Sequence, residues 1–198
     1  MKNLESKILI LIYLVSNFAY GQIKFGAKAG VGISNTTVVH GISKDRIGLV
    51  VGGVAKYQLS TRSEESYLQA EILYTNQGEY SLDLENKKYK AYIDYINIPI
   101  MYKFYFDNQG SDFFIETGPQ IGFVISDNID PLGPEANNNV LKKFDLAINA
   151  GIGYSYQRKY EFNIRYGIGL IDTYGYNISN NDINRSSLLS FSVTYFFN

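Results

Sequence analysis

Apolar residues recur at every second position from about residue 22 almost to the C-terminus, and this period restricts the fold more than any other feature. A period of two is that of β-strands, whose successive side chains point to opposite faces. Eight segments show it, and in each of them one face is apolar and uncharged. These segments are residues 25–33, 47–59, 68–74, 96–106, 113–125, 146–156, 160–170 and 189–197. We therefore predict an all-β protein of about eight strands.

The opposite face of these segments is sparsely polar and crowded with glycine. A soluble barrel would need a well-charged outer face to stay in solution, and this face is too poor in charge for that. It fits a narrow lumen better, with the apolar face toward lipid. The predicted fold is an eight-stranded antiparallel transmembrane up-and-down β-barrel with a filled polar lumen. The lumen residues predicted to form a polar network are Lys103, Glu71, Glu116, Asp145, Arg165, Asn97, Asn149 and Glu161.

Long and short connections alternate between the predicted strands. The long ones are residues 34–45, 76–92, 126–143 and 171–186, and the short ones are 60–66, 107–112 and 157–159. Outer-membrane barrels have long external loops and short periplasmic turns, and an even strand number puts both termini in the periplasm. We therefore expect an aromatic girdle at the periplasmic strand ends, formed by Phe25, Tyr57, Phe104, Phe113, Tyr154, Tyr160, Tyr195 and Phe197.

The first 21 residues are predicted to be a signal peptide, which leaves residues 22–198 as the barrel. Lys2 and Lys7 precede an apolar run at residues 8–18, and Ala19-Tyr20-Gly21 puts small residues at the −3 and −1 positions of a cleavage site. The run is well short of the roughly 20 residues that a transmembrane helix needs. The alternative is an uncleaved anchor or a core helix.

Five strands carry a family resemblance. They are "YINIPIMYKFYF" (residues 95–106), "FFIETGPQIGFVIS" (113–126), "FDLAINAGIGYSY" (144–156), "FNIRYGIGLID" (162–172) and an alternating aromatic C-terminal strand. With them, the chain resembles the outer-membrane β-barrel proteins of the Bacteroidota, often labelled porin family or PorT-like. The resemblance implies residence in the outer membrane of a Gram-negative bacterium. The last strand, "LLSFSVTYFFN", resembles the insertion signal read by the barrel-assembly machinery, although Asn198 follows the final aromatic residue.

Candidate chemistry outside the lumen is sparse. His40, Ser43 and Asp45 could suggest a catalytic triad, but such a set is defined by spatial geometry, and we favour a solvated loop histidine. Asp127, Asp130 and Glu135 are hard oxygen ligands without the spacing of a calcium loop, so we favour solvated turns. We expect no catalytic, cofactor or metal site. The formal net charge of −1 and the lack of cysteine exclude a basic nucleic-acid footprint and thiolate chemistry.

The function expected from these features is structural or based on binding by the surface loops. An eight-stranded barrel is only wide enough for side chains to fill, and buried charges need partners, so a salt-bridged plug is favoured over an open pore. We expect a monomer whose loops bind an unidentified protein or glycan. The alternatives are a PorT-like accessory of type IX secretion, a narrow channel or an outer-membrane enzyme.

Pro99 cannot donate a ladder hydrogen bond, so we expect a bulge or kink there.

Overall fold

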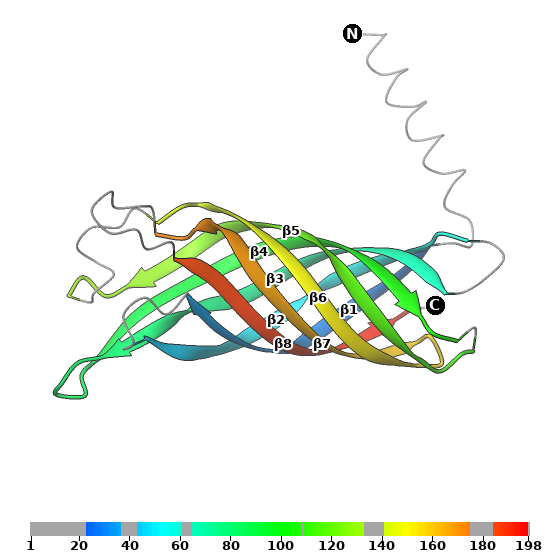
Figure 1. Ribbon diagram of the computed structural model, residues 1–198, viewed down its shortest axis with the longest axis horizontal. Helices are drawn as coiled ribbons and strands as arrows, with labels where there is room; N and C mark the ends of the chain where they lie inside the picture. Colours follow the sequence, from blue (N-terminus) through cyan, green and yellow to red (C-terminus); the bar gives the residue numbers. More distant parts are fainter. Residues whose placement is uncertain are drawn as a thin grey trace, which may run out of the picture.

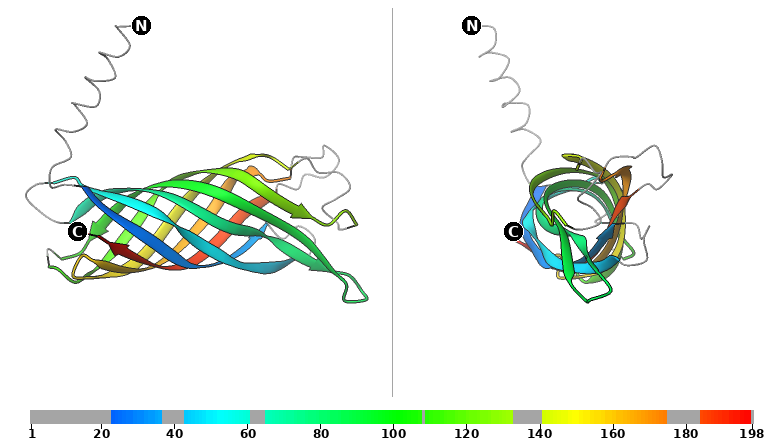
Figure 2. Two further views of the ribbon diagram at one scale, coloured as in Figure 1. Left: turned by 180° about the vertical axis from the view of Figure 1, so that it is seen from behind. Right: turned by 90° about the vertical axis from the view of Figure 1, so that its left-hand side faces the viewer.

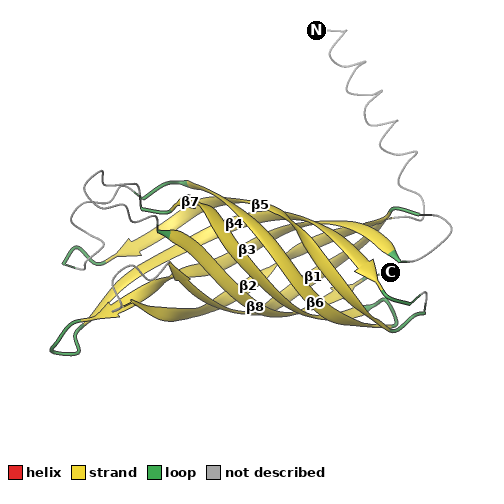
Figure 3. Ribbon diagram, in the orientation of Figure 1, coloured by secondary structure: helices red, strands yellow, loops and turns green. Residues whose placement is uncertain are grey.

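The computed structural model describes residues 23–36, 43–60, 65–107, 109–132, 141–174 and 184–197. They form a closed barrel in which each strand pairs antiparallel with its sequence neighbours, and β8 pairs with β1 (Figure 1). The predicted fold is therefore confirmed. No helix in the described residues is long and apolar enough to span a membrane. The strands are β1 Ile23–Thr36, β2 Ser43–Gln58, β3 Ser66–Leu82, β4 Lys88–Tyr105, β5 Asp112–Ile129, β6 Phe144–Tyr156, β7 Tyr160–Asp172 and β8 Arg185–Phe196 (Figure 3).

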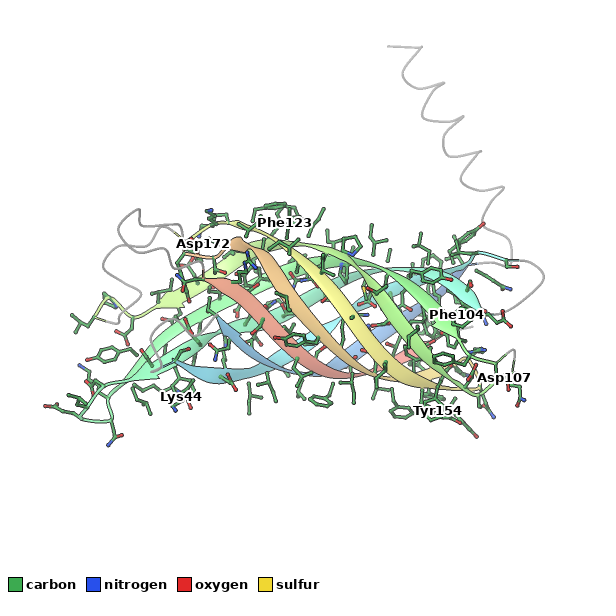
Figure 4. The ribbon with its side chains drawn as sticks, in the orientation of Figure 1. Lys44, Phe104, Asp107, Phe123, Tyr154 and Asp172 are labelled. Atoms are coloured by element: carbon green, nitrogen blue, oxygen red, sulfur yellow. The ribbon has the colours of Figure 1, made fainter. Side chains whose placement is uncertain are left out.

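The apolar face of the alternating pattern lies on the outside of the barrel. Ile152, Ile164 and Phe191 are opposite one another on β6, β7 and β8, and all three are exposed. Figure 4 shows side chains projecting outward along the whole wall. An exposed apolar surface of this extent marks contact with lipid or another apolar surface, because soluble monomers rarely carry one.

The two ends of the barrel differ. The start of β1, the C-terminus and the connection at residues 157–159 share one end, which we call the terminal end (Figures 1 and 2). The opposite end, which we call the loop end, carries the β3–β4 turn and the C-terminal ends of β5 and β7.

The connection predicted at residues 76–92 is mostly β-structure, which corrects the expected loop. β3 and β4 stay paired as far as Leu82 and Lys88, and only residues 83–87 form the turn. Asp83 holds this turn, because its Oδ1 accepts the backbone N–H groups of Glu85 and Lys87. The resulting hairpin projects from the loop end (Figure 2).

The boundaries of β2 and β5 also differ from the prediction. β2 already begins at Ser43 and β5 continues to Ile129, inside the connections expected at residues 34–45 and 126–143. The apolar pattern stops where the strands leave the outer apolar belt, whereas backbone pairing continues beyond it. A strand end read from hydrophobicity is therefore too short at the loop end.

The bulge predicted at Pro99 is absent. Pro99 lies opposite Gln120 of β5, and the same register resumes at Tyr102 and Thr117. Pairing with β3 lapses only locally, between Asn97 and Ile100, without a shift of register. Pairing with β5 lapses in the same way between Pro99 and Tyr102, so both ladders are interrupted for two residues while their registers are kept, and Pro99 remains within the strand.

Register shifts occur elsewhere, at the loop end. In the β2–β3 pair, the register shifts between Asp45 and Val50 of β2. In the β4–β5 pair, it shifts between Asp94 and Tyr95 of β4, where β5 has one extra residue. At the first, the side chain of Asn76 accepts the N–H of Leu49, so the irregular backbone keeps a partner. Near both shifts, Arg46 of β2 pairs with Asp94 of β4, with 3.4 Å between Nη2 and Oδ1.

Candidate functional site

The interior of the barrel contains a network of buried charges, which we call the ion network. Its members are at most 5% exposed, because they occupy the inward positions of the strands. Three carboxylates and four cations take part: Glu71, Glu116 and Glu161 with Lys28, Lys56, Lys103 and Arg165.

The half of the ion network nearer the loop end is organised by Arg165. Its Nη1 and Nη2 donate to the two carboxylate oxygens of Glu71 at 2.9 and 2.8 Å, and its Nε donates to Glu116 at 2.6 Å. The ammonium group of Lys28 donates to Glu71 at 2.7 Å. Arg165 thus holds two carboxylates from different strands with the planar fork that suits such pairing.

Glu161 organises the half nearer the terminal end. It accepts from Lys103 at 2.5 Å and from Lys56 at 2.6 Å, and the Tyr105 hydroxyl also donates to it. Lys103 joins the two halves, since its Nζ is 3.3 Å from Glu116 Oε2. The ion network therefore crosses the lumen as one connected set of side chains.

Aromatic rings close the lumen at the terminal end. Tyr67, Tyr105 and Phe114 are buried inside the barrel, with ring centroids 5.4 Å apart for Tyr67–Tyr105 and 5.3 Å for Tyr105–Phe114. Lys56 Nζ lies 4.0 Å from the Phe196 ring centroid. Arg158, from the turn between β6 and β7, places its guanidinium 3.7 Å from the Tyr105 centroid.

The Arg158 turn is conformationally constrained. Gln157 and Arg158 adopt φ angles of 54° and 51°, in the left-handed region that side chains seldom occupy. Arg158 is buried, and its Nη2 donates to the carbonyl of Asp107 at 2.8 Å. The backbone conformation therefore directs a cationic side chain into the mouth of the barrel.

An apolar cluster closes the loop end. Ala91, Ile93 and Tyr95 of β4 pack with Tyr174, and all four are buried. Tyr174 also donates to Glu79 at 3.4 Å, beyond the outer apolar belt. Burial raises the pKa of Glu79, and hydrogen bonds from Ser43 and Tyr174 partly oppose that shift.

Polar side chains occupy the lumen between this cluster and the ion network. Asn97 donates to Thr75 at 2.8 Å, and Asn149 donates to Gln120 at 3.2 Å. The cavity beside them has a volume of about 10 Å³, which is room for about one water molecule. Among the described residues, side chains therefore leave little free space in this part of the lumen.

The structure brings together five of the eight residues predicted for the lumen network: Lys103, Glu71, Glu116, Arg165 and Glu161. Asn97, Asn149 and Asp145 lie outside the ion network, and Asp145 instead accepts from Ser186 Oγ at 2.7 Å. Lys103 contacts Glu116 and Glu161 rather than Glu71.

Several lumen residues are absent from the predicted set. Lys28, Lys56, Tyr105 and Phe114 occupy inward positions, so the period of two was a signal that could have found them. Arg158 offered no such signal, because a charged residue in a tight turn is normally solvated.

The aromatic residues predicted as a girdle follow the outward positions near the terminal end. Phe113 and Tyr154 have ring centroids 5.0 Å apart, and Tyr195 lies 5.1 Å from Tyr160 and 5.8 Å from Phe197. Figure 4 shows Phe104 and Tyr154 in this region. The other two residues, Phe25 and Tyr57, lie near the paired ends of β1 and β2.

The remaining candidate residues are only partly described. His40 and Glu135 lie outside the described residues, as does the predicted signal peptide. Ser43 and Asp45 belong to β2. The Ser43 hydroxyl donates to Asn35 Oδ1 at 2.8 Å, and Asn35 Nδ2 donates to Asp45 Oδ1 at 2.7 Å. Asp127 pairs with Lys143 at 3.0 Å, and the backbone N–H of Asp130 donates to Lys90. Within the described ranges, no three His, Cys, Asp or Glu residues are grouped to hold a metal ion.

These features define the class of protein: a small transmembrane β-barrel with an apolar outer wall and a filled, ion-paired lumen. Residues 15–175 match the family model "Outer membrane protein beta-barrel domain", and the chain belongs to that family. Membership supports a location in the outer membrane. No curated protein matches the chain in sequence.

Several solved structures are similar to the barrel. The outer membrane enzyme PagL is 10% identical with a TM-score of 0.52, covering 85% of this chain and 98% of PagL. Neisserial surface protein A is 14% identical with a TM-score of 0.49, and the match covers 88% of this chain and 97% of that protein. Ail, the attachment invasion locus protein of Yersinia pestis, is 11% identical with a TM-score of 0.47, and the match covers 89% of this chain and 99% of Ail. At such identities, the similarity to PagL bears on the fold alone.

Proposed function

We propose that the protein is a closed outer-membrane scaffold whose loop end, at the cell surface, has a structural or binding role. The observation that carries this proposal is the filled lumen, in which an apolar cluster, an ion network and an aromatic cluster succeed one another. Such an interior stabilises a barrel and offers no aqueous path. The projecting β3–β4 hairpin provides a surface for a partner.

The same proposal places both termini in the periplasm, with the aromatic girdle at the inner membrane interface. The barrel is a monomer without enzymatic activity, and the barrel-assembly machinery reads its last strand. The sequence resemblance also places the barrel among the outer-membrane proteins of the Bacteroidota. It suggests one alternative function, that of a PorT-like accessory of type IX secretion. Deletion of the gene would separate the two, since only a secretion accessory requires loss of secreted cargo.

The orientation can be tested with cysteine labelling, because the chain has no cysteine of its own. Leu84 at the hairpin tip is fully exposed, at 104%. Leu84→Cys is expected to react with a membrane-impermeant maleimide on intact cells. The matched variant Gln109→Cys, at an exposed turn of the terminal end, should react only after permeabilisation. The reverse pattern would show that the loop end faces the periplasm.

The closed lumen predicts an absence of conductance. Purified barrel inserted in planar bilayers is expected to produce no stable ion-sized openings, because buried clusters lie toward both ends of the described lumen and little free space lies beside the polar residues between them. A difference in gel mobility between unboiled and boiled samples would verify that the inserted protein is folded. Reproducible openings from folded protein would favour the channel alternative.

A further inference from the structure

The outer wall of the barrel carries a cluster of cations at the loop end, on β2, β3 and β4. We call it the cationic face and define it as Lys44, Arg46, Lys88 and Lys90 around the rings of Tyr80 and Tyr92. Register brings these residues together, since Tyr80 is opposite Lys44 on one side and Lys90 on the other. Figure 4 shows Lys44 at the loop end.

The two tyrosine rings organise the positive charge. Lys88 Nζ lies 3.8 Å from the Tyr80 centroid and 5.9 Å from that of Tyr92. The Arg46 guanidinium carbon is 4.1 Å from the Tyr92 centroid, and Lys90 Nζ is 6.0 Å from it. These distances are in the range of cation–π attraction, which holds the cations close together despite their mutual repulsion.

The positive charge of the cationic face is mostly uncompensated. Asp94 pairs with Arg46, while Lys44, Lys88 and Lys90 form no ion pair with any of the described residues. Asp83 is also not paired with any of these three lysines, and its carboxylate instead accepts hydrogen bonds within the turn, from the N–H groups of Glu85 and Lys87 and from the Tyr89 hydroxyl. Three exposed ammonium groups are thus available to an anionic ligand.

The position of the cationic face indicates where such an anion would come from. It points away from the barrel axis and follows the exposed apolar residues of the same wall, such as Ile47 and Leu49 of β2. A ligand there would be anchored in the surrounding leaflet and would present its polar part just beyond the acyl chains. Negative groups at a membrane surface attract such basic clusters.

We propose that the cationic face binds the phosphorylated sugar head group of a glycolipid in the leaflet that surrounds the loop end. The ammonium groups of Lys44, Lys88 and Lys90 bind the phosphates, which accept charge-assisted hydrogen bonds from them, while Arg46 stays paired with Asp94. The tyrosine rings provide flat surfaces beside the sugar. This inference rests on the proposed function for the location of the loop end at the cell surface, and it names a ligand class for that surface.

The binding test uses the full folded barrel in neutral detergent micelles and a bis-phosphorylated glucosamine glycolipid as the probe. The triple variant Lys44→Ala, Lys88→Ala, Lys90→Ala is expected to bind about 100-fold more weakly, since each cation near an anionic lipid surface contributes about fivefold. The matched variant Lys87→Ala, Lys142→Ala, Lys143→Ala loses the same charge elsewhere at the loop end and should keep wild-type affinity. Equal losses in the two variants would overturn the cationic face as a specific site.

Two further probes identify the chemistry and the source of the ligand. The same glycolipid without its phosphates should bind about 100-fold more weakly to the wild type, and undiminished binding would refute phosphate recognition. A soluble phosphorylated oligosaccharide should bind more weakly than the glycolipid, because it lacks the anchored acyl chains. Equal affinity would refute the membrane source. Micelles have no sidedness, so these results are independent of the cysteine-labelling test of orientation.

Discussion

Replacing Glu161 with glutamine is expected to lower the free energy of unfolding by about 3–5 kcal/mol, the usual cost of leaving buried charges without their partner. Glu161 accepts from both Lys56 and Lys103, and a neutral amide cannot balance either ammonium group. The ion network already contains four cations and three carboxylates, so the variant leaves four cations with two. Urea unfolding in lipid vesicles, followed by circular dichroism, measures the change.

Lys56→Met is the matched control for this prediction. It removes one cation, so three cations and three carboxylates remain, and Glu161 keeps its contact with Lys103. The methionine side chain also fills most of the volume of the lysine stem. A smaller loss of stability than in Glu161→Gln is therefore expected. If the two variants lost equal stability, the balance of charge in the lumen would not be what stabilises it.

Gly52→Ala is expected to lower the free energy of unfolding by about 1–3 kcal/mol, the usual cost of overpacking. A Cβ atom at Gly52 would lie 1.9 Å from the backbone oxygen of Ile72 on β3. Backbone in a closed barrel cannot yield locally, because moving β3 disturbs its pairing with β2 and β4. The same unfolding measurement in vesicles applies.

Gly53→Ala, one residue further along β2, is expected to raise the free energy of unfolding, in contrast to Gly52→Ala. A Cβ atom at Gly53 would meet no atom within 4 Å, because this position points outward. Alanine there should raise stability by about 0.4–1 kcal/mol, since it restricts the unfolded chain. Equal effects at the two positions would mean that the inward and outward assignment of β2 is wrong.

Much of the fold could be predicted from the sequence for a simple physical reason. In lipid, every backbone polar group must be paired within the protein, so a chain of alternating apolar strands has to close into a barrel. The same alternation assigns each residue to the wall or the lumen, and it placed Lys103, Glu116 and Arg165 correctly inside. The charged character of the lumen therefore follows from the alternation of apolar and polar residues alone.

The partners within the lumen were decided only by the tertiary structure. A period of two tells which face a side chain occupies but not its height along the barrel, which depends on the register of paired strands. Register brings Lys103 to Glu161 rather than to Glu71, and it leaves Asp145 beside Ser186. It also gathers Lys44 and Lys90 around Tyr80, although these residues are far apart in the sequence.

The ends of the barrel likewise depended on tertiary contacts. The long β3–β4 hairpin continues beyond the apolar belt, where hydrophobicity no longer marks a strand. Arg158 and Tyr174 close the two mouths from connecting segments that have no periodic pattern. The sequence by itself therefore determined the closed, lipid-facing wall, because each strand's alternation is a local property. Only the three-dimensional structure determined how the two ends of the lumen are closed and where the cationic face lies. Both features are formed by residues that meet through strand pairing.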